Sequence, residues 1–547
     1  MNIKSIFHRA GGHNVTDDTA EQNVTAHDVA HRESAMKDEA GVCNLTRRKL
    51  LGVTGAMLAA QPLLAFSSSV RAAGMPSSAA LGDGKPSIPT PLSGHYPWKQ
   101  FTMDIAYGPK MPQGCQLIQI NDQPCGPEIR LKKGEIFYTT VRNRMKEPTT
   151  VHWHGILVPN LMDGVPNVSQ VPLPQGVQTT YSWPVVQGGT YWYHSHYGLQ
   201  DQQGLAGPLI LEDPDEPFVY DKEAVLFMED RLSADPYQVL DALQHKPAPE
   251  AAVEPTLPPK GDVFPYPGGK KFGVDVQYTR FPINGCLPEK PFVVEAKPGE
   301  RIRLRILNGS SSSYFCFSVQ GHELQVIAKD GNIVRPLASD AILMATAERY
   351  DALITAGKPG IYRIVGEAVG QTTGALAILR VGDAPLPAEF VAPKPEDSIA
   401  TRSQLRLADA WVIRSMLPTT MPDVPQERIE MRLNGDMKTY RWSINGEFYP
   451  DAAPVDINQT RRVVLEVVNQ TMMYHPMHLH GHFFRVLDPS MTDASHSALM
   501  DTLSVPPMSK VALEFYSNNP GRWVFHCHNM YHMVSGMLRV IQYRATE

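Results

Sequence analysis

The segment GEIFYTTVRN at residues 134–143 recurs as GERIRLRILN at 299–308 and as TRRVVLEVVN at 460–469. The copies are rich in Val, Ile, Leu and aromatic residues, and the middle copy alternates them with arginine in the period-two pattern of a β-strand. The copies recur at intervals of roughly 160 residues, so they indicate three domains of one fold.

A second motif recurs at about the same interval. It reads GTYWYHSH from Gly189, GIYRIVGE from Gly360 and GRWVFHCH from Gly521. Similar strand patterns fill most of the chain, punctuated by 41 glycines and 47 prolines, whereas long helical patterns are scarce. The sequence therefore predicts an all-β protein built of sandwiches or barrels.

The predicted boundaries follow from these motifs and from shifts in composition. We expect a signal region at 1–73, domains at 90–214, 215–383 and 404–547, and a linker at 384–403. The proline-rich stretch at 245–267 is either an excursion within the second domain or, as we prefer, a plain surface loop.

The N-terminal region resembles an export signal. Arg47 and Arg48 precede an apolar run at 53–66 and small residues at 70–73, which favours recognition by the Tat export machinery. The alternative is an uncleaved membrane anchor, but the run falls short of the ~20 residues that a spanning helix needs. We therefore expect a periplasmic or secreted protein without stable membrane insertion.

Charge and cysteine content limit the remaining possibilities. The net charge of -6 and the lack of a lysine- or arginine-rich run argue against nucleic acid as a partner. Cys43 should be lost with the signal region. Disulfides could join Cys115 to Cys125 and Cys286 to Cys316, which leaves Cys527 over, although sequence cannot fix the pairing.

Histidines distinguish the outer repeats from the middle one. His194 and His196 align with His526 and His528, where the middle repeat has Val365 and Glu367. In the same way, His154 aligns with His480, where the middle repeat has Gln320. A metal site should therefore lie between domains one and three, with domain two as a spacer.

The outer repeats contain four His-x-His pairs: His152/His154, His194/His196, His478/His480 and His526/His528. Residues i and i+2 of a strand project from one face, so each pair presents two imidazoles to one side. Converging neutral imidazoles suit borderline transition metals and not calcium or magnesium, which prefer oxygen ligands.

The last cluster, HCHNMYHMVSGM at 526–537, is the most specific. A cysteine thiolate with two imidazoles and a weak axial methionine is the blue-copper electron-transfer arrangement. Cys527, His532 and Met537 supply three of these ligands, and His475 is left to supply the fourth. Cys527 would then also act as a covalent path to the metals bound by its neighbours, His526 and His528.

The motifs HWHG, HSH, HPMHLHGH and HCHNMYHMVSGM resemble the four copper signatures of the multicopper oxidase family. Within that family the chain is most similar to bacterial periplasmic copper-resistance oxidases, although it lacks their repeated methionine-rich motifs.

The resemblance implies three cupredoxin-like Greek-key domains and four copper ions. It places type 1 copper at His475, Cys527, His532 and Met537, and type 2 copper at His152 and His478. It assigns the type 3 pair to His154, His194, His196, His480, His526 and His528.

Several further residues have two interpretations. Asp163 resembles the family acid near the three-copper cluster, but Asp before Gly is equally typical of a turn. Asp501 could orient a copper-binding imidazole, although we favour a turn-capping role.

His322 and His482 are expected to share a structural role. Methionines 472, 473, 477, 530 and 533 gather near the type 1 motif and are interpreted as core filling rather than Cu(I) binding.

The resemblance implies an oxidase that takes electrons from phenols, aromatic amines or Cu(I) and passes them to O2. One alternative is a dedicated cuprous oxidase for copper tolerance. Another is a copper-sequestering protein with little turnover. A ligand-poor scaffold is excluded by the complete set of ligand residues.

A Cys527→Ser substitution tests the type 1 assignment. Serine lacks the thiolate whose charge transfer to copper gives the blue colour, so we expect the blue absorption and substrate oxidation to be lost while the fold is retained. Absorption spectroscopy of the copper-supplied variant, with circular dichroism as the folding control, measures this. Retained blue colour would show that the type 1 ligand is another residue.

Overall fold

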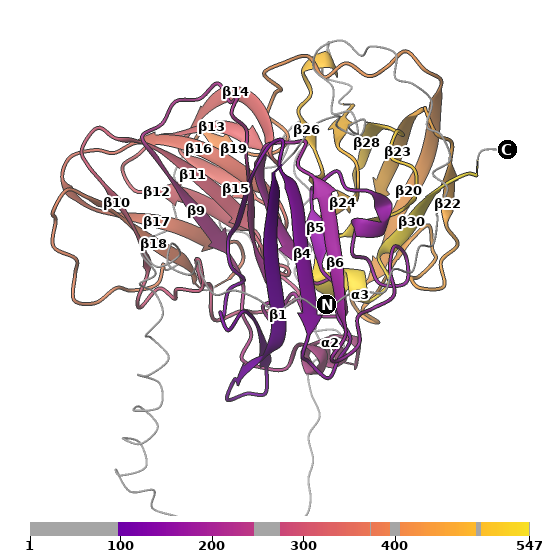
Figure 1. Ribbon diagram of the computed structural model, residues 1–547, viewed down its shortest axis with the longest axis horizontal. Coiled ribbons are helices and arrows are strands. Elements are labelled where there is room, and N and C mark those ends of the chain that lie inside the picture. Colours follow the sequence, from indigo (N-terminus) through magenta and orange to yellow (C-terminus); the bar gives the residue numbers. More distant parts are fainter. Residues whose placement is uncertain (1–96, 246–273, 372, 394–404, 488–493, 546–547) are drawn as a thin grey trace, which may run out of the picture. The chain divides into compact units, whose positions relative to one another are not determined.

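The computed structural model describes residues 97–245, 274–371, 373–393, 405–487 and 494–545. In these residues β-strands predominate and helices are few and short, so the predicted all-β class is confirmed (Figure 1). The expected signal region and Cys43 lie outside the described residues. The strands fall into three groups along the chain, each made of two sheets.

The first strand group, β1–β8, forms sheets of order β2-β1-β4-β6 and β3-β8-β7-β5. It is coloured indigo to magenta in Figure 1. Its elements are β1 (Trp98–Lys110), β2 (Gln116–Ile120), β3 (Ile129–Lys132), β4 (Ile136–Asn143), β5 (His152–His154), the 3-10 helix η2 (Asn160–Met162), β6 (Gln178–Pro184), β7 (Gly189–His194) and β8 (Ala206–Glu212).

The middle strand group, β9–β19, forms sheets of order β10-β18-β17-β12-β15-β19 and β14-β13-β16-β11-β9. Its elements are β9 (Lys222–Met228), α2 (Pro236–His245), β10 (Phe292–Ala296), β11 (Arg301–Asn308), β12 (Phe315–Val319), β13 (Leu324–Lys329), β14 (Asn332–Ser339), β15 (Ala341–Met344), β16 (Arg349–Thr355), β17 (Gly360–Ala368), β18 (Gly374–Val381) and β19 (Leu407–Ala408).

The third strand group, β20–β30, forms sheets of order β21-β20-β23-β28-β25-β26 and β22-β30-β29-β24-β27. Its elements are β20 (Gln426–Asp436), β21 (Arg441–Ile444), β22 (Val455–Ile457), β23 (Arg462–Asn469), β24 (His475–Leu479), β25 (Phe484–Val486), η5 (Ala494–His496), β26 (Leu499–Met500), β27 (Thr502–Val505), β28 (Lys510–Tyr516), β29 (Arg522–Cys527), α3 (Met530–Val534) and β30 (Leu538–Tyr543).

The asparagine that ends β4, β11 and β23 makes equivalent hydrogen bonds in all three strand groups. The side-chain oxygens of Asn143, Asn308 and Asn469 each accept the backbone N–H two residues later, which forms an Asx turn. Their amide groups donate to carbonyls of the segments that follow. In the outer groups, these turns begin the segments that lead to the histidine strands β5 and β24.

Alternation in the sequence does not always mean an exposed face. In β4 buried residues alternate with half-buried or exposed ones, as expected of a strand. In β11 both faces are covered, because Arg303 and Arg305 are buried against carboxylates, among them Asp351. The middle strand group therefore contains buried charge.

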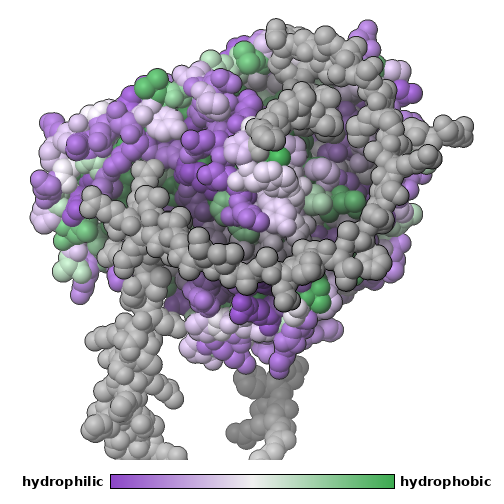
Figure 2. Space-filling model, in the orientation of Figure 1, coloured by the Kyte–Doolittle hydropathy of each residue, from purple (hydrophilic) through white to green (hydrophobic). Residues whose placement is uncertain are grey.

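On the face drawn in Figure 2, hydrophobic residues are scattered among hydrophilic ones. Isolated exposed apolar side chains are common on protein surfaces and need no partner. No helix among the described residues has both the length and the apolar character required to cross a membrane.

Candidate metal centres

Strand register brings the His-x-His pairs together within each outer strand group. In the first group β5 pairs with β7, so that His152 lies opposite His194. In the third group β24 pairs with β29, so that His478 lies opposite His526. The paired strands therefore present imidazoles side by side, as period-two geometry predicts.

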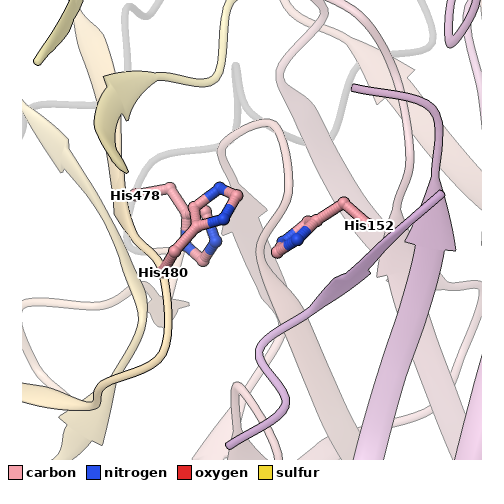
Figure 3. A group of neighbouring side chains, drawn as sticks. All are labelled: His152, His478 and His480. Atoms are coloured by element: carbon pink, nitrogen blue, oxygen red, sulfur yellow. The ribbon is translucent and has the colours of Figure 1, made fainter. Parts of the chain in front are cut away.

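Imidazoles from the first and third strand groups meet in one buried cluster. Figure 3 shows His152, from the first group, facing His478 and His480 of the third. The rings of His152 and His480 stack with centroids 3.8 Å apart, and those of His154 and His478 also lie 3.8 Å apart. Eight buried imidazoles form this cluster, which we call the histidine cluster: His152, His154, His194, His196, His478, His480, His526 and His528.

Four of these eight rings, those of His152, His154, His194 and His478, are held by one nitrogen and leave the other free. His152 Nδ1 lies 2.7 Å from the carbonyl oxygen of Asp163, and His478 Nδ1 lies 2.8 Å from that of Asp501. His194 Nδ1 is held in the same way by the Ser195 carbonyl, 2.9 Å away. Because a carbonyl oxygen only accepts hydrogen bonds, the held nitrogen carries the proton and the opposite nitrogen has a lone pair.

The free nitrogens are the evidence that the cluster fits a metal. Nε2 of His152, His194 and His478, and both nitrogens of His528, are buried without a hydrogen-bond partner among the described residues. A buried, unpaired acceptor costs roughly 1–3 kcal/mol, so several at one place favour a compensating positive charge. Imidazole nitrogens in this number suit borderline transition metals such as copper.

Burial also keeps these rings neutral. It lowers the pKa of His154, His194 and His528 well below the ordinary value of histidine, helped by neighbouring imidazoles. Burial likewise lowers the pKa of four further histidines: His196, His475, His480 and His526. Their lone pairs are therefore available to a metal without loss of a proton.

A second centre lies beside the first, around Cys527. Its Sγ is 3.5 Å from Nδ1 of His475 and 3.7 Å from Nδ1 of His532, and these two nitrogens are 3.1 Å apart. Burial raises the pKa of the Cys527 thiol, so a thiolate here requires a positive ion nearby. Met537 is fully buried, and its carbonyl accepts the backbone N–H of Cys527.

Short local structures orient the two imidazoles of this second centre. Asn529 caps α3, because its side chain accepts the backbone N–H groups of Tyr531 and His532. The Nε2 atoms of His475 and His532, which point away from Cys527, are also held by polar side chains. That of His475 lies 2.7 Å from Thr471 Oγ1, and that of His532 lies 2.6 Å from a carboxylate oxygen of Asp275, so both Nδ1 atoms face Cys527.

Asp163 takes part in the histidine cluster. Its buried carboxylate lies 3.0 Å from Nδ1 of His480 and 3.2 Å from Nδ1 of His152. The turn that we also considered is present, since Gly164 has φ +77° and an added Cβ would lie 1.8 Å from the Val151 carbonyl oxygen. The two interpretations of Asp163 are therefore compatible.

The favoured turn-capping role of Asp501 is wrong. Its carboxylate is fully buried and contacts side chains, with Oδ1 3.1 Å from Nε2 of His154. Burial alone would raise the pKa of Asp501, but the guanidinium of Arg349 and the hydrogen bonds bring it well below its usual value. The carboxylate is therefore ionised, and it orients an imidazole.

The structural role expected for His322 and His482 is confirmed. Nδ1 of each bonds the carbonyl oxygen two residues earlier, at 2.8 Å from Gln320 and 3.0 Å from His480. Of the methionines near the type 1 motif, 477, 530 and 533 are buried in the core as expected, whereas Met472 is 41% exposed.

Both suggested disulfides are wrong. Cys115, Cys125 and Cys316 are free thiols. Spacing along the chain carries no information about whether two Cβ atoms approach within bonding distance, which is why the suggestion failed.

Sequence reasoning missed three residues that orient the two centres: Thr471 and Asp275, which hold ligand-type imidazoles, and Arg349, which holds Asp501. Thr471 stands four residues before His475, and no motif marks it. Asp275 and Arg349 belong to the middle part of the chain and reach the centres only through tertiary packing.

Comparisons with known proteins agree with this geometry. Three family models, each described as multicopper oxidase, match residues 105–216, 248–384 and 422–547. Multicopper oxidase MmcO of Mycobacterium tuberculosis is 36% identical over 426 residues, covering 76% of this chain and 81% of its own. This chain belongs to the multicopper oxidase family.

A second relative and a solved structure illustrate the range of similarity. Copper resistance protein A of Escherichia coli is 28% identical, covering 77% of this chain and 88% of its own length. The crystal structure of laccase from Botrytis aclada, with a TM-score of 0.65 and 22% identity, covers 82% of this chain and 88% of its own and shows the same fold.

Membership of the multicopper oxidase family establishes the general chemistry. The protein is a copper-dependent oxidoreductase that uses O2 as the electron acceptor. Its buried imidazole clusters and the Cys527 thiol are donors that suit copper.

The lowered histidine pKa values predict how the stability of the copper-free protein depends on pH. In the unfolded chain these residues take up protons near pH 6.5, whereas in the folded protein they stay neutral, so the unfolded state binds more protons as the pH falls. We expect the free energy of unfolding to fall by about 1 kcal/mol per histidine for each pH unit below about 6.5.

Urea unfolding of the copper-free protein between pH 7.5 and pH 5 measures this slope. A His528→Gln variant should have a shallower slope, because one titrating group is removed. Stability that stays constant or rises over this range would contradict the interpretation.

Proposed function

We propose that the protein oxidises a reducing substrate by one-electron steps at a type 1 copper and reduces O2 to water at a cluster of three further coppers. The observation that carries this proposal is the position of Cys527. Its sulfur faces His475 and His532, whereas its sequence neighbours, His526 and His528, belong to the histidine cluster. One residue thus joins two centres of different composition.

The proposed ligands follow the family pattern, residue by residue. Type 1 copper takes His475, Cys527, His532 and Met537, and type 2 copper takes His152 and His478. The type 3 pair takes His154, His194, His196, His480, His526 and His528. The free, buried nitrogens of His152, His154, His194, His478 and His528 support this assignment.

Bound copper would supply reversible one-electron transfer and a place for O2 to react. The polypeptide supplies the connection between centres, through the covalent bonds from Cys527 to its neighbours. A hydrogen bond offers a second route, since Nδ1 of His526 lies 3.0 Å from the Cys527 carbonyl oxygen. Burial of both centres excludes bulk water and keeps the imidazoles in place.

Asp163 is proposed to hold and deliver protons for the reduction of O2. Four protons are consumed for each O2 converted to water, so an acid is needed close to the histidine cluster. Asp163 is 1% exposed, and its carboxylate contacts His152 and His480, one from each outer strand group. Such a group contributes typically about 10²–10⁴-fold to a rate.

The proposed substrates are phenols, aromatic amines or Cu(I). His475 and His532 have no exposed surface, and Asp275 covers the outward nitrogen of His532. Substrates therefore release electrons through the protein rather than by contact with a ligand imidazole, which favours broad tolerance. Relatives named laccase and copper resistance protein A are consistent with both kinds of substrate.

We also propose the domain boundaries 90–214, 215–383 and 404–547. The three strand groups agree with them except at β19 (Leu407–Ala408), which pairs with β15 of the middle group. Export through the Tat machinery to the periplasm or beyond is proposed from Arg47, Arg48 and the apolar run after them.

Oxygen uptake by copper-loaded protein tests the proposed function. We expect O2 consumption on addition of a phenol or Cu(I), with the two rates separating a laccase-like enzyme from a dedicated cuprous oxidase. A Cys527→Ser protein under identical conditions is the control for copper chemistry in solution. No uptake with either substrate would favour the copper-sequestering alternative and contradict the proposal.

An Asp163→Asn variant tests the acid. The amide keeps the size of the side chain but holds no transferable proton, so kcat should fall about 10²-fold or more while the blue type 1 absorption is unchanged. Steady-state oxygen uptake measures the rate. Unchanged kcat would assign Asp163 to the turn alone.

A further inference from the structure

A buried arginine of the middle strand group reaches the histidine cluster. Arg349 begins β16 and is 1% exposed. Its Nη1 and Nη2 donate to the two carboxylate oxygens of Asp501 at 2.8 and 2.5 Å, which is bidentate pairing. Its Nε donates to the Thr190 carbonyl of β7 at 3.3 Å, so one side chain contacts all three strand groups.

Asp501, held by Arg349, in turn contacts two imidazoles of the histidine cluster. Oδ1 of its carboxylate lies 3.1 Å from Nε2 of His154, whose other nitrogen is free. Its backbone carbonyl oxygen lies 2.8 Å from Nδ1 of His478, whose other nitrogen is also free. The two held rings stack on each other, one from each outer strand group.

The middle strand group also holds the backbone of Asp501. Asp330 Oδ2 accepts the N–H groups of Asp501 and Thr502, each at 3.2 Å. Asp330 pairs with Arg349 as well, at 3.2 Å, and its Oδ1 accepts the Arg349 N–H at 3.1 Å. Both the side chain and the main chain of Asp501 are therefore fixed from the middle strand group.

The Arg349–Asp501 pair packs closely against a glycine of the first strand group. An ideal Cβ added to Gly155, the residue after His154, would lie 2.6 Å from Arg349 Nη2 and 2.6 Å from Asp501 Oδ2. The guanidinium and the carboxylate thus lie directly against the backbone of Gly155, whose φ of +80° also favours glycine.

We propose that Arg349 is a positioning residue for the oxygen-reducing centre, which fixes His154 and His478 through the Arg349–Asp501 pair. The middle strand group, which supplies none of the proposed ligands, thereby sets the geometry of a centre built from the other two. This inference rests on the proposed assignment of His154 and His478 as copper ligands.

The physical reason lies in the shape of the guanidinium. Its planar fork fixes both carboxylate oxygens at once, whereas an ammonium offers a single point charge. Groups that orient metal ligands from outside typically change metal affinity about 10- to 100-fold when they are mutated. A loosened Asp501 would let the His154 and His478 rings turn their free nitrogens away from the metal.

Full-length, copper-loaded Arg349→Lys and Arg349→Gln proteins test the proposal. Electron paramagnetic resonance separates type 1 from type 2 copper, and chelator dialysis followed by copper analysis measures retention. We expect an unchanged blue absorption and type 1 signal, a shifted type 2 signal, and about 10- to 100-fold faster loss of copper from the histidine cluster. Lysine should restore part of the loss seen with glutamine.

Arg303→Lys is the matched control. Arg303 is equally buried in the middle strand group and pairs with Asp351 through two nitrogens, and none of its hydrogen bonds is to Asp501. It should leave the type 2 signal and copper retention as in the wild type. If Arg349→Gln fails to fold, Asp330→Asn is the second variant. It weakens the hydrogen bonds from the backbone N–H groups of Asp501 and Thr502, so it should shift the type 2 signal too.

A wild-type type 2 signal and normal copper retention in the Arg349 variants would overturn the inference. Equal losses in Arg303→Lys would also overturn it, because Arg349 would then act only on stability. Failure of the proposed function differs from both results, since the wild-type protein itself would then consume no O2 with either substrate or would lack the blue type 1 absorption.

Discussion

Unshared electron pairs on buried imidazoles are the constraint on which the rest of the structure depends. Rings from the first and third strand groups stack at 3.8 Å, and several of their nitrogens have no hydrogen-bond donor within reach. A bound positive charge would therefore stabilise this arrangement. Metal binding and the association of the outer strand groups are therefore coupled, because neither set of imidazoles is complete without the other.

The middle strand group contributes more than distance between the outer two. Asp275 holds His532 beside Cys527, and Arg349 and Asp330 hold Asp501 beside His154. In each case a carboxylate, that of Asp275 or Asp501, holds one nitrogen of a ligand-type imidazole. The other nitrogen of that imidazole faces the metal position. Carboxylates placed in this way also make the bound imidazole a better donor.

The sequence predicted the parts of the site that depend on local periodicity. His152 and His154 project together because strands repeat every two residues, and Cys527 faces away from His526 and His528 for the same reason. The partners that hold these rings depend on tertiary approach, which no local pattern records. Asp501 was therefore misinterpreted as a cap, and the contacts of Asp275 and Arg349 could not have been foreseen.

Diffraction from copper-loaded crystals, measured at the copper absorption edge, tests most directly whether imidazoles from both ends of the chain hold the metal. The account predicts one anomalous peak between Cys527, His475 and His532, and three peaks among the eight rings of the histidine cluster. Peaks elsewhere, or metal bound by one outer strand group alone, would contradict it.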